Sequence, residues 1–156
     1  MFIGREQELR TLNQLYASGK FEFAVIYGRR RVGKTALISE FIKGKDAIFF
    51  TGVETNAKQN LENFSQCIMD YQGSDSPGVT FPSFQAALES VFRVAKSQRV
   101  ILVIDEYPYV AHAAKSLAST LQLLIDKHHA DSKLFLILCG VLYGRSGACL
   151  QSAALR

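Results

Sequence analysis

The sequence lacks several features that would point to secretion, metal binding or membrane insertion. It has no tryptophan and only three cysteines, Cys67, Cys139 and Cys149, which are odd in number and far apart. No Cys-x-x-Cys pair or other zinc-ligand spacing is present, so a disulfide framework or a zinc site is not indicated. No apolar run approaches the roughly 18 residues of a membrane span, and the N-terminus does not read as a signal peptide. We therefore expect a cytoplasmic protein with reduced thiols and no membrane association.

The composition is that of one globular domain. The chain has 156 residues, of which 48% are hydrophobic and 21% are charged, a length that suits a single core. The formal net charge is +4, which permits contact with a polyanion but identifies none. DNA as a partner is compatible with this charge but has no further support in the sequence.

Apolar segments alternate along the chain with segments of helical periodicity. The segments predicted as strands are 21–27, 47–51, 100–104 and 134–139, and those predicted as helices are 5–18, 34–43, 56–71, 84–96 and 117–128. The strands are apolar throughout instead of alternating in polarity, which is typical of a parallel sheet covered on both faces. The predicted fold class is therefore α/β, with three layers.

A phosphate-binding motif follows the first predicted strand. The stretch "GRRRVGKT", from Gly28 to Thr35, has the Walker A spacing and opens an amphipathic helix. Such a loop turns successive backbone N–H groups toward an anion, and glycine allows the close approach. Lys34 is expected to reach the β- and γ-phosphates of a nucleotide, and the Thr35 hydroxyl to bind Mg²⁺.

The loop also contains three consecutive arginines, Arg29, Arg30 and Arg31, followed by Val32. One interpretation is a DNA-binding cluster. The other, which we favour, is that their backbone N–H groups serve the loop while the side chains extend into solvent or toward the phosphates.

A second acidic motif ends the third predicted strand. In "VILVIDEYPYV", Asp105 and Glu106 follow a run of apolar residues, which is the Walker B arrangement. Asp105 is expected to hold the metal's water shell, and Glu106 to act as the base that polarises the attacking water. A strand lies between the two motifs in the sequence, and a glutamate follows the aspartate; both features favour the additional-strand, catalytic-glutamate class of P-loop proteins.

Together, "FIGREQEL", "YGRRRVGKTALISEF", "AIFFTG" and "LVIDEYPYVA" resemble the archaeal/bacterial ATPase family, which lies near the STAND branch of the AAA+-type P-loop NTPases. The resemblance covers residues 1–140. It implies a parallel sheet of order 5-1-4-3-2, binding of ATP with Mg²⁺, and a position beside the adenine for Phe2, Ile3 and Gly4.

The chain departs from this family after residue 140. Relatives place a polar sensor after the fourth strand, whereas here "LILCG" continues into Val141. We find no fifth strand and no helical lid, so residues 141–156 are expected to form an irregular tail of a truncated or internally deleted family member. The edge of the strand at 21–27 would then be open, which predicts self-association or a partner protein.

The sequence thus predicts an ATP-binding core at residues 1–140 that hydrolyses ATP weakly with Mg²⁺. The alternative is a nucleotide-binding module, or a fragment, without efficient turnover. The predicted catalytic residues are Glu106 and Lys34, and the predicted metal-binding residues are Thr35 and Asp105. The predicted nucleotide-binding residues are Phe2, Ile3, Gly4, Arg5, Gly28, Arg29, Arg30, Arg31, Val32, Gly33, Lys34, Thr35 and Ala36.

Overall fold

A computed structural model of the chain describes residues 6–28, 33–73, 78–141 and 149–152. Its elements, in chain order, are α1 (Glu6–Ala17), β1 (Glu22–Gly28), α2 (Lys34–Ile42), β2 (Ala47–Thr51), α3 (Ala57–Tyr71), α4 (Phe84–Val94), β3 (Val100–Asp105), α5 (Tyr107–Ala113), α6 (Leu117–His128), β4 (Leu134–Val141) and β5 (Cys149–Ser152). Within those ranges, no helix has the length and apolar character needed to cross a lipid bilayer.

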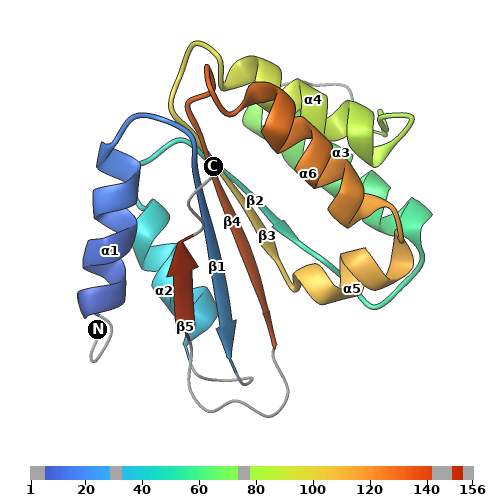
Figure 1. Cartoon of the computed structure of the whole chain (residues 1–156). Helices are drawn as coiled ribbons and strands as arrows, with labels where there is room; N and C mark the ends of the chain where they lie inside the picture. The colour runs from blue at the N-terminus through green and yellow to red at the C-terminus, as the bar shows by residue number, and fades with distance from the viewer. Residues whose placement is uncertain (1–5, 29–32, 74–77, 142–148, 153–156) are drawn as a thin grey trace.

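The strands form one sheet in the order β2-β3-β4-β1-β5. β1, β2, β3 and β4 are parallel, and β5 pairs antiparallel to β1. Helices α1 and α2 lie on one side of the sheet, and α3, α4 and α6 lie on the other (Figure 1). Because the four parallel strands run in one direction, their carboxyl ends meet at one edge of the sheet, where α2 and α5 begin.

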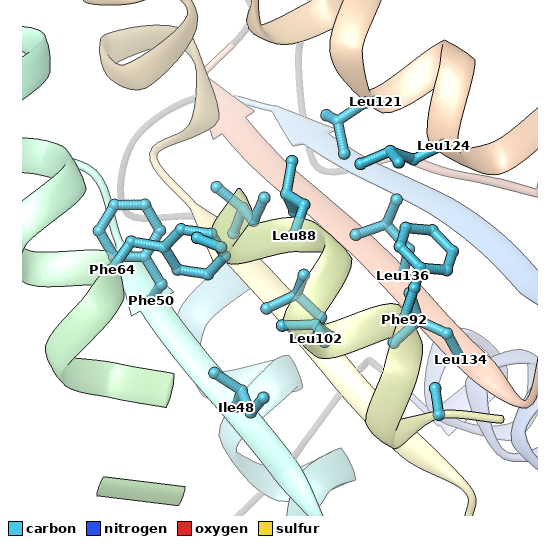
Figure 2. Packing of buried hydrophobic residues seen from close by; sticks show 14 of the residues in the cluster. Ile48, Phe50, Phe64, Leu88, Phe92, Leu102, Leu121, Leu124, Leu134 and Leu136 are labelled. Atoms are coloured by element: carbon cyan, nitrogen blue, oxygen red, sulfur yellow. The ribbon is translucent and has the colours of Figure 1, made fainter. Parts of the chain in front are cut away.

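Each face of the sheet has its own apolar core, which is why the four parallel strands are largely apolar. On the side of α3, α4 and α6, alternate strand residues such as Phe50 and Leu136 pack against helix residues such as Phe64 and Phe92 (Figure 2). The rings of Phe50 and Phe64 stack with centroids 5.0 Å apart. On the other face, residues of β1, β3 and β4 pack against α1 and α2.

A half-buried arginine, Arg99, joins the end of α1 to the amino-terminal edge of the sheet. Its guanidinium donates hydrogen bonds to the carbonyls of Leu15 (2.8 Å), Tyr16 (3.1 Å), Lys20 (2.5 Å) and Lys133 (2.7 Å). Carbonyls at a helix C-terminus have no partner within the helix, and here a cation supplies one. Burial lowers the pKa of Arg99. This contact is far from the end of the sheet where the phosphate-binding motif lies.

The α/β class and the four parallel strands predicted from the sequence are confirmed. β2 and α6 have the predicted bounds, and the other predicted elements that the structure describes differ by a few residues at their ends. Asn56, expected as the first residue of α3, is instead its N-cap, and its side chain accepts a hydrogen bond from the N–H of Gln59. Helix α5 and strand β5 were not predicted.

The prediction that the fifth strand is missing, and that β1 has an open edge, is wrong. Residues 149–152, part of the tail expected to be irregular, pair with Ala24–Tyr27 of β1. The pairing leaves the order 5-1-4-3-2 intact, but the added strand is antiparallel to its neighbour. Because every backbone can supply N–H and C=O groups to an unpaired strand, poor strand propensity did not prevent the pairing. The edge that motivated an expectation of self-association is therefore covered over Ala24–Tyr27.

Candidate functional site

The strand register places the two predicted motifs side by side. Thr51 at the end of β2 is level with Asp105 of β3, and the β3–β4 register pairs Ile104 with Leu138. If that register is continued by one residue, Asp105 is level with Cys139 of β4. Cys139 in turn is paired with Ile26 of β1. The acid that ends β3 therefore lies at the same edge of the sheet as the loop that leaves β1.

The amino-terminal end of α2 forms one side of this site. Gly33 is the N-cap residue and has a left-handed conformation, with φ 85° and ψ 20°. Its carbonyl accepts the first hydrogen bond of the helix, from the N–H of Leu37, at 2.9 Å. Glycine carries no side chain that could cap the N–H groups of the helix's first turn, so the first turn of α2 is suited to receive an anion. Lys34, the first residue of the helix, is 7% exposed.

A hydrogen bond joins the two motifs across 70 positions in the sequence. The Thr35 hydroxyl donates to Oδ2 of Asp105 over 3.2 Å. Asp105 is 5% exposed, and its other oxygen, Oδ1, accepts from the backbone N–H of Glu106 at 2.9 Å. Both carboxylate oxygens are thus held by protein groups, which orients the carboxylate toward the start of α2.

Glu106 occupies a special backbone position. It is the N-cap residue of α5 and has φ 53° and ψ 40°, which makes it the only described non-glycine residue with a positive φ. Such a conformation is uncommon for a residue with a side chain. This residue lies at the turn from the end of β3 into α5, and its side chain is half-buried.

The buried thiol of Cys139 lies close enough to several charged residues of this edge for them to affect its pKa. Cys139 is 2% exposed. Burial raises the pKa of its thiol, and the negative charges of Asp105 and Glu106 raise it further. The positive charge of Lys34 lowers the pKa. Three of the candidate charged residues, from α2, β3 and the turn after β3, therefore lie within electrostatic reach of one atom. The thiol itself stays protonated at neutral pH.

The arrangement fits a nucleotide with Mg²⁺. Magnesium takes oxygen ligands and, in phosphate-handling sites, uses few protein groups together with phosphates and water. The Thr35 hydroxyl and the Asp105 carboxylate supply two such oxygens at one place. A buried lysine and an uncapped helix start supply the positive field that a triphosphate requires. The residue chemistry and the geometry therefore agree.

Of the remaining predicted nucleotide-binding residues, the structure describes only Gly28 and Ala36. Gly28 ends β1 opposite Val141 of β4, and Ala36 is an exposed residue in the first turn of α2. The predicted adenine-side residues and most of the loop lie outside the described residues: Phe2, Ile3, Gly4, Arg5, Arg29, Arg30, Arg31 and Val32.

Sequence reasoning missed the contribution of α5 to this edge. Pro108 lies in the first turn of α5, where proline is favoured because its missing N–H has no helical partner. That proline after the acidic pair was the available indication of a helix start. Gly140 of β4 and Gly52 after β2 both lie against this turn, which no local pattern reveals.

A family described as an ATPase domain predominantly from Archaea matches residues 2–152. A protein of Methanocaldococcus jannaschii described as uncharacterized is 34% identical over 140 residues, covering 90% of this chain and 29% of that protein. An uncharacterized ATP-binding protein of the same organism is 44% identical over 45 residues, covering 29% of this chain and 76% of that protein. The chain thus spans less than a third of the longer of these two relatives.

Solved structures share the fold. Cdc6p of Pyrobaculum aerophilum has a TM-score of 0.64 at 18% identity, covering 91% of this chain and 40% of that protein. The Aeropyrum pernix ORC1 protein, solved in complex with DNA, has a TM-score of 0.62 at 16% identity, covering 92% of this chain and 40% of that protein. At these identities the likeness concerns the fold alone. With the family match over nearly its whole length, the chain belongs to the family of ATPase domains found predominantly in Archaea.

Proposed function

We propose that this domain binds ATP with Mg²⁺ between the loop after β1 and the end of β3, and that it hydrolyses the nucleotide slowly. The observation that carries the proposal is the hydrogen bond from Thr35 to Asp105, which joins the two motifs predicted from the sequence. The family assignment and a relative described as ATP-binding support it. We assign the core to residues 1–140; residues 141–156 are an atypical addition that completes the sheet through β5.

Each residue has a distinct role in the proposal. The backbone of the loop and the first turn of α2 receive the phosphates, and the Lys34 ammonium contacts the β- and γ-phosphates. The Thr35 hydroxyl is a metal ligand, and the Asp105 carboxylate holds the metal's water shell in place. When bound, the metal neutralises charge that develops on the phosphates during transfer.

Glu106 is the proposed general base. A carboxylate at this position accepts a proton from the attacking water and orients it toward the terminal phosphate. The alternative is a nucleotide-binding module without efficient turnover, which is favoured by Val141 at the position where the family resemblance implies a polar sensor. Slow turnover that depends on Glu106 is consistent both with a carboxylate at position 106 and with Val141 in place of a polar sensor.

The metal role of Asp105 can be tested by changing it to asparagine. The wild-type domain should bind ATP more tightly with Mg²⁺ than with EDTA. Asp105→Asn keeps the shape and can still accept from Thr35, but it loses the charge that holds the metal's water shell. We expect the affinity gained from Mg²⁺ to fall by about 10- to 100-fold, the range for groups that support a bound metal. Equilibrium titration with a fluorescent ATP analogue measures it.

A matched control is Asp126→Asn on α6. That carboxylate is exposed and accepts a hydrogen bond only one turn away, from Gln122 at 2.8 Å. Its replacement should leave the Mg²⁺ dependence unchanged. Equal Mg²⁺ dependence in wild type and Asp105→Asn would show that Asp105 has no metal role.

A further inference from the structure

Two glycines lie on either side of Glu106 at the carboxyl edge of the sheet. Gly52 follows Thr51, which is level with Asp105, so Gly52 is level with Glu106 on the β2 side. On the other side, the register that pairs Ile104 with Leu138 sets Glu106 level with Gly140 when it is continued by two residues. Both glycines are buried. The turn that leads from β3 into α5 thus passes between two positions without side chains.

Gly52 contacts the backbone of the Asp105–Glu106 turn directly. Its N–H donates to the carbonyl of Asp105 at 2.8 Å. A Cβ atom at this position would lie 2.7 Å from the carbonyl oxygen of Glu106 and 2.4 Å from Cγ2 of Val110. The first of these is a backbone atom of the proposed base, and Val110 is fully buried, so neither neighbour can move aside without displacing the turn.

Gly140 contacts the same helical turn from the opposite side. A Cβ atom there would lie 2.6 Å from Cδ and 2.9 Å from Cγ of Pro108. These atoms belong to a ring that is closed onto the backbone nitrogen, so they have little freedom to rotate away. A side chain on Gly140 would therefore push the first turn of α5 away from the sheet.

We propose that Gly52, Gly140 and Pro108 form a seat that positions Glu106 for hydrolysis. The inference rests on the proposed function, because it assigns a role to residues around the proposed base. The seat holds α5 close against the strand ends, and this closeness keeps Glu106 in its left-handed turn. The glycine that contacts the proline, Gly140, immediately precedes Val141, which occupies the position where the family resemblance implies a polar sensor. The three seat residues are positioning residues, since they act through Glu106.

The main test is Gly140→Ala. Displacement of a catalytic group by about 1 Å can cost on the order of 100-fold in rate, so we expect the single-turnover rate of ATP hydrolysis to fall by about 10- to 100-fold. ATP affinity should change by less than about threefold, because Lys34 and Thr35 are untouched. Gly52→Ala should act in the same direction. This separation of rate from affinity distinguishes positioning from general damage to the fold.

The matched control is Gly44→Ala, at the end of α2. Gly44 has φ 73°, and no heavy atom lies within 4 Å of the place that an added methyl group would take, so alanine there strains the backbone without touching a neighbour. It should lower the melting temperature and leave the hydrolysis rate unchanged. A loss of rate in Gly44→Ala equal to that in Gly140→Ala would show that any destabilised variant is slow, and would overturn the seat.

Rescue gives a sharper test. The double variant Gly140→Ala with Pro108→Ala removes the two ring atoms that the new methyl group meets. We expect it to recover most of the lost rate, which is the non-additive behaviour of residues in contact. Additive losses in the double variant would contradict the proposed contact.

Hydrogen exchange tests the seat without relying on turnover. Amides in residues 105–113 should exchange faster in Gly140→Ala than in wild type, return toward the wild-type rate in the double variant, and stay unchanged in Gly44→Ala. Unchanged exchange in Gly140→Ala would overturn the seat. A Glu106→Gln variant in the same assays separates the proposed base from the proposed seat. If Glu106→Gln hydrolyses ATP at the wild-type rate, Glu106 is not the base. If Glu106→Gln loses turnover while Gly140→Ala keeps full activity, only the seat is contradicted.

Discussion

Replacing Lys34 with alanine is expected to lower the affinity of the domain for ATP by about 100-fold. Lys34 is buried at the start of α2, next in sequence to Thr35, whose hydroxyl contacts Asp105, and we propose that its ammonium contacts the phosphates. Loss of one partner from a desolvated, charge-assisted contact costs about 3 kcal/mol, and every 1.4 kcal/mol is about a factor of ten in affinity. Isothermal titration calorimetry with ATP and Mg²⁺ measures the change.

Lys43→Ala is a suitable control, since Lys43 follows the last residue of the same helix. Its ammonium pairs with Glu40 at 2.8 Å, and its side chain is 72% exposed. The same loss of a lysine at the far end of α2 should leave ATP affinity within about twofold, because surface pairs contribute little. If Lys34→Ala binds ATP as tightly as Lys43→Ala does, the phosphate site has been assigned wrongly.

Replacing Glu106 with glutamine should separate hydrolysis from binding. Glutamine keeps the size of the side chain and removes the proton acceptor, and general base catalysis contributes about 100- to 10,000-fold in rate. We expect the single-turnover rate to fall within this range while ATP affinity changes by less than about threefold. Rapid-quench measurement of phosphate release under excess enzyme gives the rate, and a titration on the same preparation gives the affinity.

Glu89→Gln on α4 controls for the change from acid to amide. Glu89 is half-buried like Glu106, and its carboxylate accepts a hydrogen bond from Gln85 at 3.1 Å. Its replacement should leave both rate and affinity unchanged. An equal loss of binding in Glu106→Gln and Asp105→Asn would contradict the division of roles between the two acids, and undiminished hydrolysis in Glu106→Gln would remove it as the base.

The sequence was sufficient to predict the layers of the fold because its apolar segments are long and unbroken. Runs such as "VILVI" in β3 and "LFLILC" in β4 are buried on both faces, and only a parallel sheet between two helical layers buries them so. The two motifs were expected to form one site because a Walker A loop and a Walker B acid act on the same nucleotide and metal. The hydrogen bond between Thr35 and Asp105 agrees with that expectation.

The features that escaped prediction are short or depend on distant contacts. Helix α5 has seven residues, too few for a periodic pattern, and β5 has four. β5 forms because the edge of β1 would otherwise be unpaired. Whether that edge is free depends on the order of the strands, which the four residues "CLQS" do not encode. The left-handed turn at Glu106 and the close contact of Gly140 with Pro108 depend likewise on how α5 packs against two strands.

The measurement that tests the central claim most directly is amide hydrogen exchange of the unaltered chain, with and without saturating ATP and Mg²⁺. We predict slower exchange in residues 28–37, which cover the loop and the first turn of α2, and in residues 105–110, which cover the end of β3 and the turn into α5. Little change is expected in α4, on the opposite face of the sheet from α2. No change in either segment, or slower exchange confined to α3, α4 and α6, would contradict a nucleotide site at this edge of the sheet.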